Sequence, residues 1–586
     1  MIRAALDGTH ILVTADAESA EIAATLPGIR RTAKMAPCTW HMPLSAESID
    51  QLRGAGARAS PELIAEAKRL LATRRYVEAQ KQTAHVEPLR PLPLKPGVQL
   101  YTHQIKMANI ALALMGYSEN GIHRDAGSAA FFAEMGTGKS SVTVATIGRL
   151  FLDGKVSRAL VVAPSSVCAV WPHEYSKFAG FPYRIAVLLG ERDKRLAALK
   201  ALQALTLPHD APEPLRVAVI NYESVRLLEA ELAAYGADMI IADESQRIKT
   251  PTAQQSKAMH RLGDRTKYKL ILTGTPITQD TRDVWSQYRF LDPSIFGGSY
   301  YTFVKHYATM GGYGQHQYLG PRNLPELTRK AHSIAFRVQK SECLDLPEKL
   351  FEDRIVELEP NAQALYRRIQ KESYAALESG GEVTASIVLT RLLRLQQIAG
   401  GFLTDDDGVT IPVSTAKLEA ALDIVQTLCL DEGQKLVIFA RFRAEVQAIR
   451  ARVDALLQPA GLCHVAIWGD VPIIKRGEIV TQFQDDPNTR VMVAQIDAAA
   501  EGITLTAAHT TLYYSLTWNL AKYMQSQDRT HRIGQDHGTL YIHLIAPGTI
   551  DAKIMAALKK KQSLAHSVVD NWRLLLTEDM KGADSQ

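Results

Sequence analysis

The sequence predicts an α/β fold with two parallel-sheet lobes, helical insertions and a small N-terminal module. Short runs rich in valine and isoleucine, such as ALVVAP, RVAVINY, MIIADE and LILTGT, alternate with stretches of helical periodicity. Runs of this kind, bounded by turns and separated by helices, are typical of buried parallel strands. They occur in two series, near residues 130–275 and 435–545. A glycine-rich loop between a strand and a helix stands at the start of the first series.

The N-terminal part of the chain predicts a separate small unit. We expect residues 1–60 to form an α/β accessory module, with ILVTADA as a strand and SIDQLRGAG as a short helix. Residues 61–97 open with a proline at the expected first helical turn, continue with apolar spacing near 3.6 and end in a proline-rich run. This pattern predicts a helix followed by a linker.

The two series of strands set the expected lobe boundaries. The first lobe is predicted over 98–350, with a helical insertion from about 280, and the second over 351–560, with a helical insertion at its start. The stretch 280–430 between the series is mostly helical and polar in pattern. Residues 561–586 are expected to form a C-terminal helix and tail.

Composition limits the class of protein. The chain has 586 residues, of which 46% are hydrophobic, so about three or four globular domains are expected. No apolar run reaches the length of a membrane span, and the N-terminus turns acidic too early for a secretory signal. A formal net charge of +5 permits a nucleic-acid partner without establishing one.

The cysteines indicate a reducing compartment. Five cysteines lie far apart and form no CxxC pair, which argues against a zinc site and against a disulfide framework. We therefore expect an intracellular protein. The compact architecture and the lack of a nuclear-targeting basic run favour a bacterial or viral source and a cytoplasmic location, whereas a eukaryotic source would make the protein nuclear.

The segment SAAFFAEMGTGKSS predicts a phosphate-binding loop. A strand at Ala129–Phe132 runs into a loop from Ala133 through the glycines to Lys139 and Ser140, and a helix follows. Glycines let backbone N–H groups point at phosphates, and the helix N-terminus adds partial positive charge. Lys139 can reach the β- and γ-phosphates of ATP, and Ser140 can hold Mg²⁺. The bland alternative is a glycine-rich turn without a ligand.

The segment MIIADESQRIKT predicts the second half of the site. An apolar strand ends in two acids, Asp243 and Glu244. A carboxylate there can bind Mg²⁺, and its neighbour can orient or deprotonate the attacking water. We assign Asp243 to the metal and Glu244 to the water. The alternative is a pair of solvated acids at a strand end.

The order of the motifs resembles a known family. Gln104, AEMGTGKS, APSSVCAVWPHE, VINYES, DESQRIKT, LTGTP and QSQDRTHRIGQ follow one another as in the superfamily-2 helicase-like ATPases, and specifically in the SWI/SNF-type group. The last segment, at 525–535, is the most diagnostic, and the resemblance covers about 98–560. It implies two RecA-like lobes of the P-loop NTPase class and DNA-dependent ATP hydrolysis at the cleft between them.

The resemblance assigns residues to the nucleotide. Gln104 would contact the adenine, and Lys139 with Asp243 and Glu244 would do the chemistry. The residues that would cradle ATP and its Mg²⁺ are Met135, Gly136, Thr137, Gly138, Lys139 and Ser140.

Other residues would couple the nucleotide to DNA. Thr273 and Thr275 of LTGTP, Gln525, and Gly502 of AAAEGITLT are assigned to coupling, with Gly502 also touching the nucleotide. Arg529 and Arg532 would be arginine fingers from the second lobe; the alternative for them is a solvated basic helix face.

Two positions depart from the family pattern. Gln246 replaces the usual histidine of the acidic motif, which puts the details of coupling in question. Glu501 is unexpected in the AAAEGITLT segment, and its role is open.

Three residues are candidates for DNA contact, and each has a bland alternative. Ser165 either contacts the phosphate backbone or caps a turn, Lys249 either contacts it or is a solvated charge, and Trp518 either contacts DNA or belongs to the core. Residues 1–60 faintly resemble the HARP-type DNA-structure-recognition module of annealing helicases; the alternative is an accessory unit packed on the first lobe.

These observations leave three functional hypotheses open. The first is a translocase on double-stranded or branched DNA that remodels DNA structures or displaces bound proteins, expected to be monomeric, with protein partners undetermined. The second is a strand-separating DNA or RNA helicase. The third is a non-catalytic scaffold, against which the intact Lys139, Asp243, Glu244, Arg529 and Arg532 argue.

Overall fold

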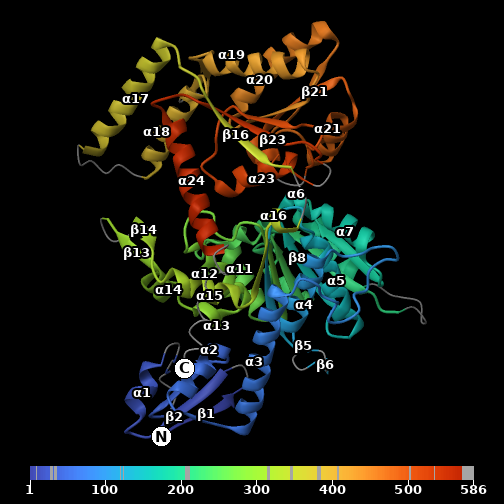
Figure 1. The fold of residues 1–586 in the computed structure, drawn as a ribbon, viewed down its shortest axis with the longest axis vertical. Coiled ribbons are helices and arrows are strands. Elements are labelled where there is room, and N and C mark those ends of the chain that lie inside the picture. The colour runs from blue at the N-terminus through green and yellow to red at the C-terminus, as the bar shows by residue number, and fades with distance from the viewer. Residues whose placement is uncertain are drawn as a thin grey trace. The chain divides into compact units, whose positions relative to one another are not determined.

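The structure is a computed structural model (Figure 1). It describes residues 1–7, 10–26, 29, 31, 36–118, 121–122, 125–204, 212–312, 317–343, 347–378, 385–405, 408–499, 503–532 and 535–569. The chain divides into two compact units: the first is Met1–Gln339 together with Ala565–Gln586, and the second is Lys340–Leu564. The division falls ahead of the expected boundary at 350, because the strand that contains residue 350 belongs to the second sheet.

A small mixed sheet begins the first unit. Its strand order is β3-β2-β1-β4, with β1 (Ile2–Asp7), β2 (His10–Ala15), β3 (Thr39–Pro43) and β4 (Arg58–Ala59). Alternating residues of the strands, among them Ile11, Val13 and Met42, are fully buried beside α1 (Ala20–Thr25) and α2 (Ala46–Gly54). The expected strand and helix of this module both form.

A long helix, α3 (Pro61–Gln82), follows the small sheet. The Ser60 side chain accepts a hydrogen bond from the Leu63 N–H and Pro61 takes the first position, which is how a helix start is usually satisfied. Leu63 belongs to the core of the N-terminal module. At the other end, the buried Lys81 ammonium donates to the His332 carbonyl (2.7 Å) and to Glu78 (2.9 Å). The helix is therefore packed at both ends.

The first lobe is built on a seven-stranded parallel sheet in the order β15-β7-β12-β11-β8-β10-β9. Its central strands are buried on both faces, as their Val/Ile/Ala composition requires. The strands are β7 (Gly127–Ala133), β8 (Arg158–Ala163), β9 (Tyr183–Leu188), β10 (Leu215–Asn221), β11 (Met239–Asp243), β12 (Tyr268–Thr273) and β15 (Ala335–Val338).

Helices cover this sheet and connect its strands (Figure 1). They are α4 (Thr102–Leu114), α5 (Lys139–Leu152), α6 (Ser165–Cys168), α7 (Val170–Phe178), α8 (Arg192–Gln203), α9 (Tyr222–Val225), α10 (Glu229–Tyr235), a 3-10 turn η1 (Ser245–Ile248) and α11 (Gln254–Gly263). A small hairpin pairs β5 (Tyr117–Ser118) with β6 (Gly121–Ile122).

The stretch after β12 is mostly helical, as its polar pattern predicts. It contains α12 (Asp283–Leu291), α13 (Pro293–Phe296), α14 (Tyr300–Tyr307), a hairpin of β13 (Ala308–Gly311) and β14 (Gln317–Pro321), and α15 (Leu324–His332). The expectation that 280–430 is mostly helical does not include the short hairpins in this stretch, and it also misses two strands that join the main sheets. β15 adds to the edge of the first sheet, and β16 adds to the edge of the second. Both are short or exposed edge strands, so neither shows the long apolar run of a central strand.

The second lobe has a six-stranded parallel sheet in the order β16-β23-β22-β19-β21-β20. Its strands are β16 (Lys349–Ile355), β19 (Leu436–Ala440), β20 (Cys463–Ile467), β21 (Thr489–Gln495), β22 (Thr510–Tyr513) and β23 (Thr539–Ile545). The elements around it are α16 (Lys340–Cys343), α17 (Pro360–Glu378), α18 (Ala385–Ala399), the hairpin β17 (Phe402–Thr404) and β18 (Thr410–Pro412), α19 (Ala416–Val425), α20 (Arg443–Leu457), α21 (Ile473–Asp485), α22 (Ile496–Ala499), α23 (Leu520–Thr530) and α24 (Ile550–Val569).

Candidate nucleotide site

The phosphate loop lies at the carboxyl end of β7 and leads directly into α5. Gly136 (φ 84°) and Gly138 (φ 88°) both adopt the left-handed conformation that glycine tolerates best. A Cβ atom on Gly138 would lie only 2.1 Å from Gln104 Nε2. The first turn of α5 carries no acidic residue and no side-chain cap, so its N–H groups and partial positive charge face the loop.

Lys139 lies folded into this loop and is 9% exposed. Its ammonium group donates to the carbonyl oxygens of Ala133 (2.8 Å) and Glu134 (3.2 Å). A buried ammonium held by loop carbonyls beside a helix N-terminus is the donor set that a phosphate group needs. Ser140 follows on the same helix turn and is half-buried. The residues present therefore fit the phosphates of a nucleoside triphosphate.

Gln104 is held against the phosphate loop from α4. Its Oε1 accepts the Tyr101 N–H (3.1 Å), and its Nε2 donates to the Thr137 carbonyl (3.2 Å). His103 Nε2 lies 2.9 Å from the same carbonyl. The predicted adenine contact, Gln104, and the predicted phosphate cradle are thus neighbours, although Gln104 and Thr137 are 33 residues apart in sequence.

Asp243 and Glu244 lie at the end of β11, one strand removed from β7, and both are buried (6% and 7% exposed). The Trp171 Nε1–H donates to Asp243 Oδ2 (3.2 Å). Burial raises the pKa of Asp243, the adjacent Glu244 raises it further, and Lys139 opposes both. Two buried carboxyl groups that disfavour joint ionisation are a donor set that a divalent cation would relieve, so the pair fits Mg²⁺.

A line of hydrogen bonds leads away from Glu244. Glu244 has a left-handed backbone (φ 52°), unusual outside glycine, and its Oε2 accepts from Gln246 Nε2 (2.7 Å). Gln246 Oε1 in turn accepts from Thr273 Oγ1 (2.7 Å), and that hydroxyl accepts the Thr275 N–H (3.0 Å). The glutamine that replaces the family histidine therefore joins the acidic motif to LTGTP.

The DNA-contact candidates lie in different settings. Lys249 donates to Thr278 Oγ1 (2.6 Å) and lies 3.6 Å from Asp283, so its ammonium is already engaged in the loop after LTGTP. Ser165 begins α6 and is half-buried. Trp518 is half-buried in the second lobe after β22, and its carbonyl accepts from Lys561. Their contact with DNA stays a prediction.

The two arginines of the last motif differ in their surroundings. Arg529, 1% exposed, donates to the carbonyls of Ile503 (3.0 Å) and Gln525 (3.2 Å), inside its own lobe. Arg532 is half-buried and donates to Thr504 Oγ1 (3.1 Å). Gly502 and Glu501 lie outside the described residues. These contacts give Arg529 a local supporting position and leave Arg532 as the more available guanidinium.

Two known protein-family models match the segments that contain these motifs. The SNF2-related domain matches residues 98–401, which is more than half of the chain. The chain belongs to the SNF2-related family of helicase-like ATPases. The helicase conserved C-terminal domain matches residues 416–534 of this SNF2-related chain, so both lobes carry the family pattern.

Relatives of this SNF2-related protein occur in animals and bacteria. The mouse DNA annealing helicase and endonuclease ZRANB3 is 29% identical over 462 residues, covering 76% of this chain and 40% of the mouse protein. The putative ATP-dependent helicase/translocase YwqA of Bacillus subtilis is 26% identical over 464 residues, covering 77% and 48%. The chain thus spans less than half the length of either relative.

Among solved structures, the Sulfolobus solfataricus SWI2/SNF2 ATPase core in complex with dsDNA is 26% identical and covers 83% of this chain and 95% of that chain. The TM-score is 0.38, too low for the likeness to support any argument about shape.

Sequence reasoning missed three residues of this SNF2-related site. Trp171 holds Asp243, Arg337 on β15 contacts the phosphate loop, and Lys340 contacts the last motif. Trp171 lies within APSSVCAVWPHE, so its position in a recognised motif was an available signal. Arg337 and Lys340 lie in FRVQK, whose two cations look like ordinary surface charges until the fold buries them.

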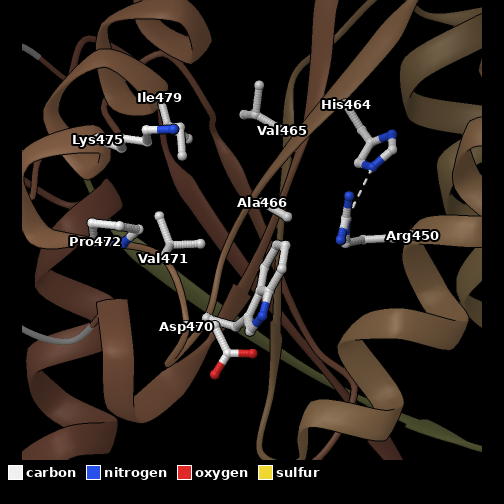
Figure 2. A pocket seen from close by; sticks show the side chains of 10 residues that line it. Arg450, His464, Val465, Ala466, Asp470, Val471, Pro472, Lys475 and Ile479 are labelled. Carbon is white, nitrogen blue, oxygen red and sulfur yellow. Dashed lines mark hydrogen bonds between the residues drawn. The ribbon is translucent and has the colours of Figure 1, made fainter.

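The second lobe of this SNF2-related chain also has a surface pocket of about 370 Å³ beside β20 and α21 (Figure 2). The Arg450 guanidinium lies 4.5 Å from the centre of the Trp468 ring and donates to His464 Nε2 (3.4 Å). None of the predicted site residues lines it. Among the described residues, no helix combines the length and apolar character needed to cross a membrane.

Proposed function

We propose that this chain is an ATP-dependent double-stranded DNA translocase that remodels DNA structures or displaces DNA-bound proteins. The observation that carries the proposal is the line of hydrogen bonds that leads from Glu244 through Gln246 to Thr273 and Thr275 of LTGTP. Lys139 and the acidic pair lie at the carboxyl edge of one parallel sheet, where α/β proteins bind ligands. Gln246 joins that pair to Thr273, in the motif that the family resemblance associates with DNA coupling.

The residues of the first lobe divide the work on ATP. The loop N–H groups and Lys139 bind the phosphates, Gln104 faces the base, and Glu244 orients and deprotonates the attacking water. Ser140 and Asp243 would hold Mg²⁺, which neutralises charge on the phosphate oxygens when bound. Gln246 fixes the Glu244 side chain through one hydrogen bond, so its contact with Thr273 can report the state of the acid to the rest of the lobe.

The second lobe supplies Arg532 in this proposal. A guanidinium that reaches the γ-phosphate only during part of the cycle would make hydrolysis depend on lobe movement. Arg529 supports it indirectly, because it holds the backbone of the 503–505 segment, whose Thr504 contacts Arg532.

DNA binding is proposed as backbone contact that is independent of sequence and sensitive to salt. The relatives' names favour DNA as the substrate, since one is called a DNA annealing helicase and another a helicase/translocase, and we propose that the DNA is duplex or branched. A strand-separating DNA or RNA helicase is the alternative, because both activities use the same ATP site.

The test is steady-state ATP hydrolysis at fixed low salt, without nucleic acid and with duplex DNA, single-stranded DNA, forked DNA or duplex RNA. A parallel assay measures strand separation on a labelled duplex and displacement of a protein block. Lys139→Ala serves as the control for the assigned site, because it removes the ammonium that partners the phosphates.

We expect strong stimulation by duplex DNA with block displacement and without strand separation. Stimulation mainly by single strands or RNA, together with unwinding, would favour the helicase alternative. Hydrolysis by Lys139→Ala at the wild-type rate would remove the site assignment itself.

A further inference from the structure

The short segment that leaves the first unit carries a buried cation at each end. Arg337 lies on β15, the last strand of the first lobe, and Lys340 is the first residue of the second unit. Both are nearly inaccessible, at 8% and 4% exposed. Burying a charged side chain is costly unless it is paired and hydrogen-bonded, so the contacts of these two residues are informative.

Arg337 contacts two motifs of the nucleotide site. Its guanidinium donates to the Glu134 carboxylate (3.0 Å) inside the phosphate loop and to the Gly274 carbonyl (3.3 Å) inside LTGTP. A third contact, to the Phe132 carbonyl (3.2 Å), anchors it to β7. The planar guanidinium reaches these three acceptors, which lie on three different segments, through N–H groups fixed in one plane. A movement of either the phosphate loop or LTGTP would therefore change the hydrogen bonds of Arg337.

Lys340 contacts the motif that carries the arginines. Its ammonium donates to Asp528 Oδ1 (2.6 Å) and to the His531 carbonyl (3.0 Å). Asp528 is the neighbour of Arg529 on α23, and His531 is the neighbour of Arg532. Burial works to raise the pKa of Asp528, but Lys340 and Lys349 outweigh it and leave the pKa lowered. The Asp528 carboxyl is therefore ionised at neutral pH.

The chain itself joins these two contacts. Only Val338 and Gln339 separate the cations, so their Cα atoms can never be more than about 11 Å apart. A displacement of one contact must be taken up within three peptide units or passed to the other.

We propose that Arg337 and Lys340 are positioning residues that form one mechanical linkage between the phosphate loop and the arginine-bearing end of α23. This linkage rests on the proposed ATP-driven function and adds to it the path by which the first lobe's nucleotide state reaches Arg532. Neither residue touches the reacting atoms in this proposal.

The test is a mutant cycle on ATP turnover. Arg337→Gln, Lys340→Gln and the double variant are compared, together with an insertion of two glycines between Val338 and Gln339. The insertion retains both cations and all their partners but breaks the short connection. Measured quantities are kcat and KM for ATP with and without duplex DNA, binding of a fluorescent ATP analogue, and thermal unfolding.

Two matched controls separate linkage from lost charge. Lys349→Gln removes another lysine 3.6 Å from the same Asp528 carboxylate, but from β16 rather than from the connecting segment. Arg261→Gln removes an exposed bidentate arginine–glutamate pair of the first lobe. Both should keep wild-type turnover.

We expect each single variant to lower DNA-stimulated kcat by about twofold to thirtyfold, with KM within about threefold of wild type. The double variant should be no slower than the slower single variant, because one linkage can be broken only once. The insertion should match it. The linkage would be overturned if the losses of kcat in the two single variants multiplied in the double variant. It would also be overturned if the insertion variant kept the wild-type kcat.

The outcome is separable from that of the proposed function. If duplex DNA fails to stimulate the wild-type protein, the translocase proposal fails, and the same cycle is then scored on DNA-independent kcat. If Arg337→Gln lowers the unfolding temperature, the insertion variant, which removes no side chain, decides the matter.

Discussion

At the scale of single residues, polar side chains of the nucleotide site hydrogen-bond to one another across motifs. Gln246 is the clearest case, since its amide nitrogen donates to Glu244 and its amide oxygen accepts from Thr273. A histidine ring also offers two polar atoms on opposite edges. The glutamine can thus replace the family histidine and still join the two motifs.

Gln246→Ala should weaken the stimulation of ATP hydrolysis by DNA without preventing ATP binding. ATP binding should stay near wild type, while DNA-stimulated kcat falls by about twofold to thirtyfold because Glu244 loses its connection to Thr273. The measurement is ATPase with and without duplex DNA, beside nucleotide titration. Gln255→Ala is the matched control, because that amide bonds only the Arg247 carbonyl of the same turn among the contacts described. Equal losses in both variants would speak against a relay.

Arg532→Ala and Arg529→Ala should fail in different ways. Arg532→Ala should bind nucleotide and keep its unfolding temperature, but lose about 10³–10⁵ in rate. Arg529→Ala removes a buried guanidinium from two carbonyls and should destabilise the second lobe by about 2 to 3 kcal/mol. Single-turnover hydrolysis and thermal unfolding distinguish the two. An Arg529→Ala variant with normal stability and no turnover would instead make Arg529 the finger.

At the scale of elements, the sequence predicts the central strands and the phosphate loop well, because each carries its own local signal. The apolar runs of β8, β10, β11 and β12 are buried as expected, and the loop glycines are left-handed as a phosphate cradle requires. β15 and β16 were not predicted, because edge strands are specified by their partners β7 and β23 rather than by composition.

Side-chain contacts inside the site, like the edge strands, depend on partners that are distant in sequence. The acidic pair could be found from its position after an apolar run, but its contact with Trp171 joins residues 72 apart. The bond between Arg337 and Glu134 joins residues 203 apart. Such contacts depend on the order of strands in the sheet, which local patterns do not encode.

Glu445, at the start of α20, joins three elements of the second lobe. Its Oε2 accepts from the Arg441 and Phe442 N–H groups (3.0 Å each) and from Ser515 Oγ (2.6 Å). Its Oε1 faces Gly400 and has no hydrogen-bond partner among the residues that the structure describes. Burial raises the pKa of Glu445 from 4.5 to about 7. The folded protein thus keeps a proton here that the unfolded chain has released.

Glu445→Gln should therefore change the pH dependence of stability. Between pH 4.5 and about 7 the folded state holds more protons than the unfolded state, so wild-type stability falls as pH rises through this window. Glutamine keeps an acceptor oxygen and cannot ionise. The unfolding temperature of the variant relative to wild type should rise from pH 5 to pH 8, by an amount equivalent to at most about 3 kcal/mol. A constant difference across this range would contradict the assignment.

At the scale of the whole molecule, the N-terminal module presents a candidate surface for DNA structure. Residues that alternate with its buried core point to the opposite face of the sheet, where Arg3 on β1 pairs in register with Arg58 on β4. Both arginines are exposed. We propose that this face contacts the phosphates of branched DNA.

Arg3→Ala with Arg58→Ala should then weaken binding to forks more than to plain duplexes. The salt dependence of fork binding should lose about one unit of slope for each arginine, while stimulation of ATPase by plain duplex stays unchanged. Fluorescence anisotropy at several salt concentrations measures both. Arg69→Ala, an exposed arginine of α3 paired with Glu66, is the control. Equal slopes in all three proteins would leave the module without this role.

The double docking of α3 also decides where this protein can be cut or recombined. Leu63 completes the core of the N-terminal module, and Lys81 is buried against the His332 carbonyl of the first lobe. A chimera joined at residue 60 would remove Leu63 from the core of the N-terminal module. It would also leave α3 on the first lobe without the module that α3 normally packs against. The segment to exchange is therefore residues 1–82, and the recipient lobe must keep a carbonyl at the position of His332. Without it, the buried Lys81 ammonium of the transplanted module would lose one of its hydrogen bonds.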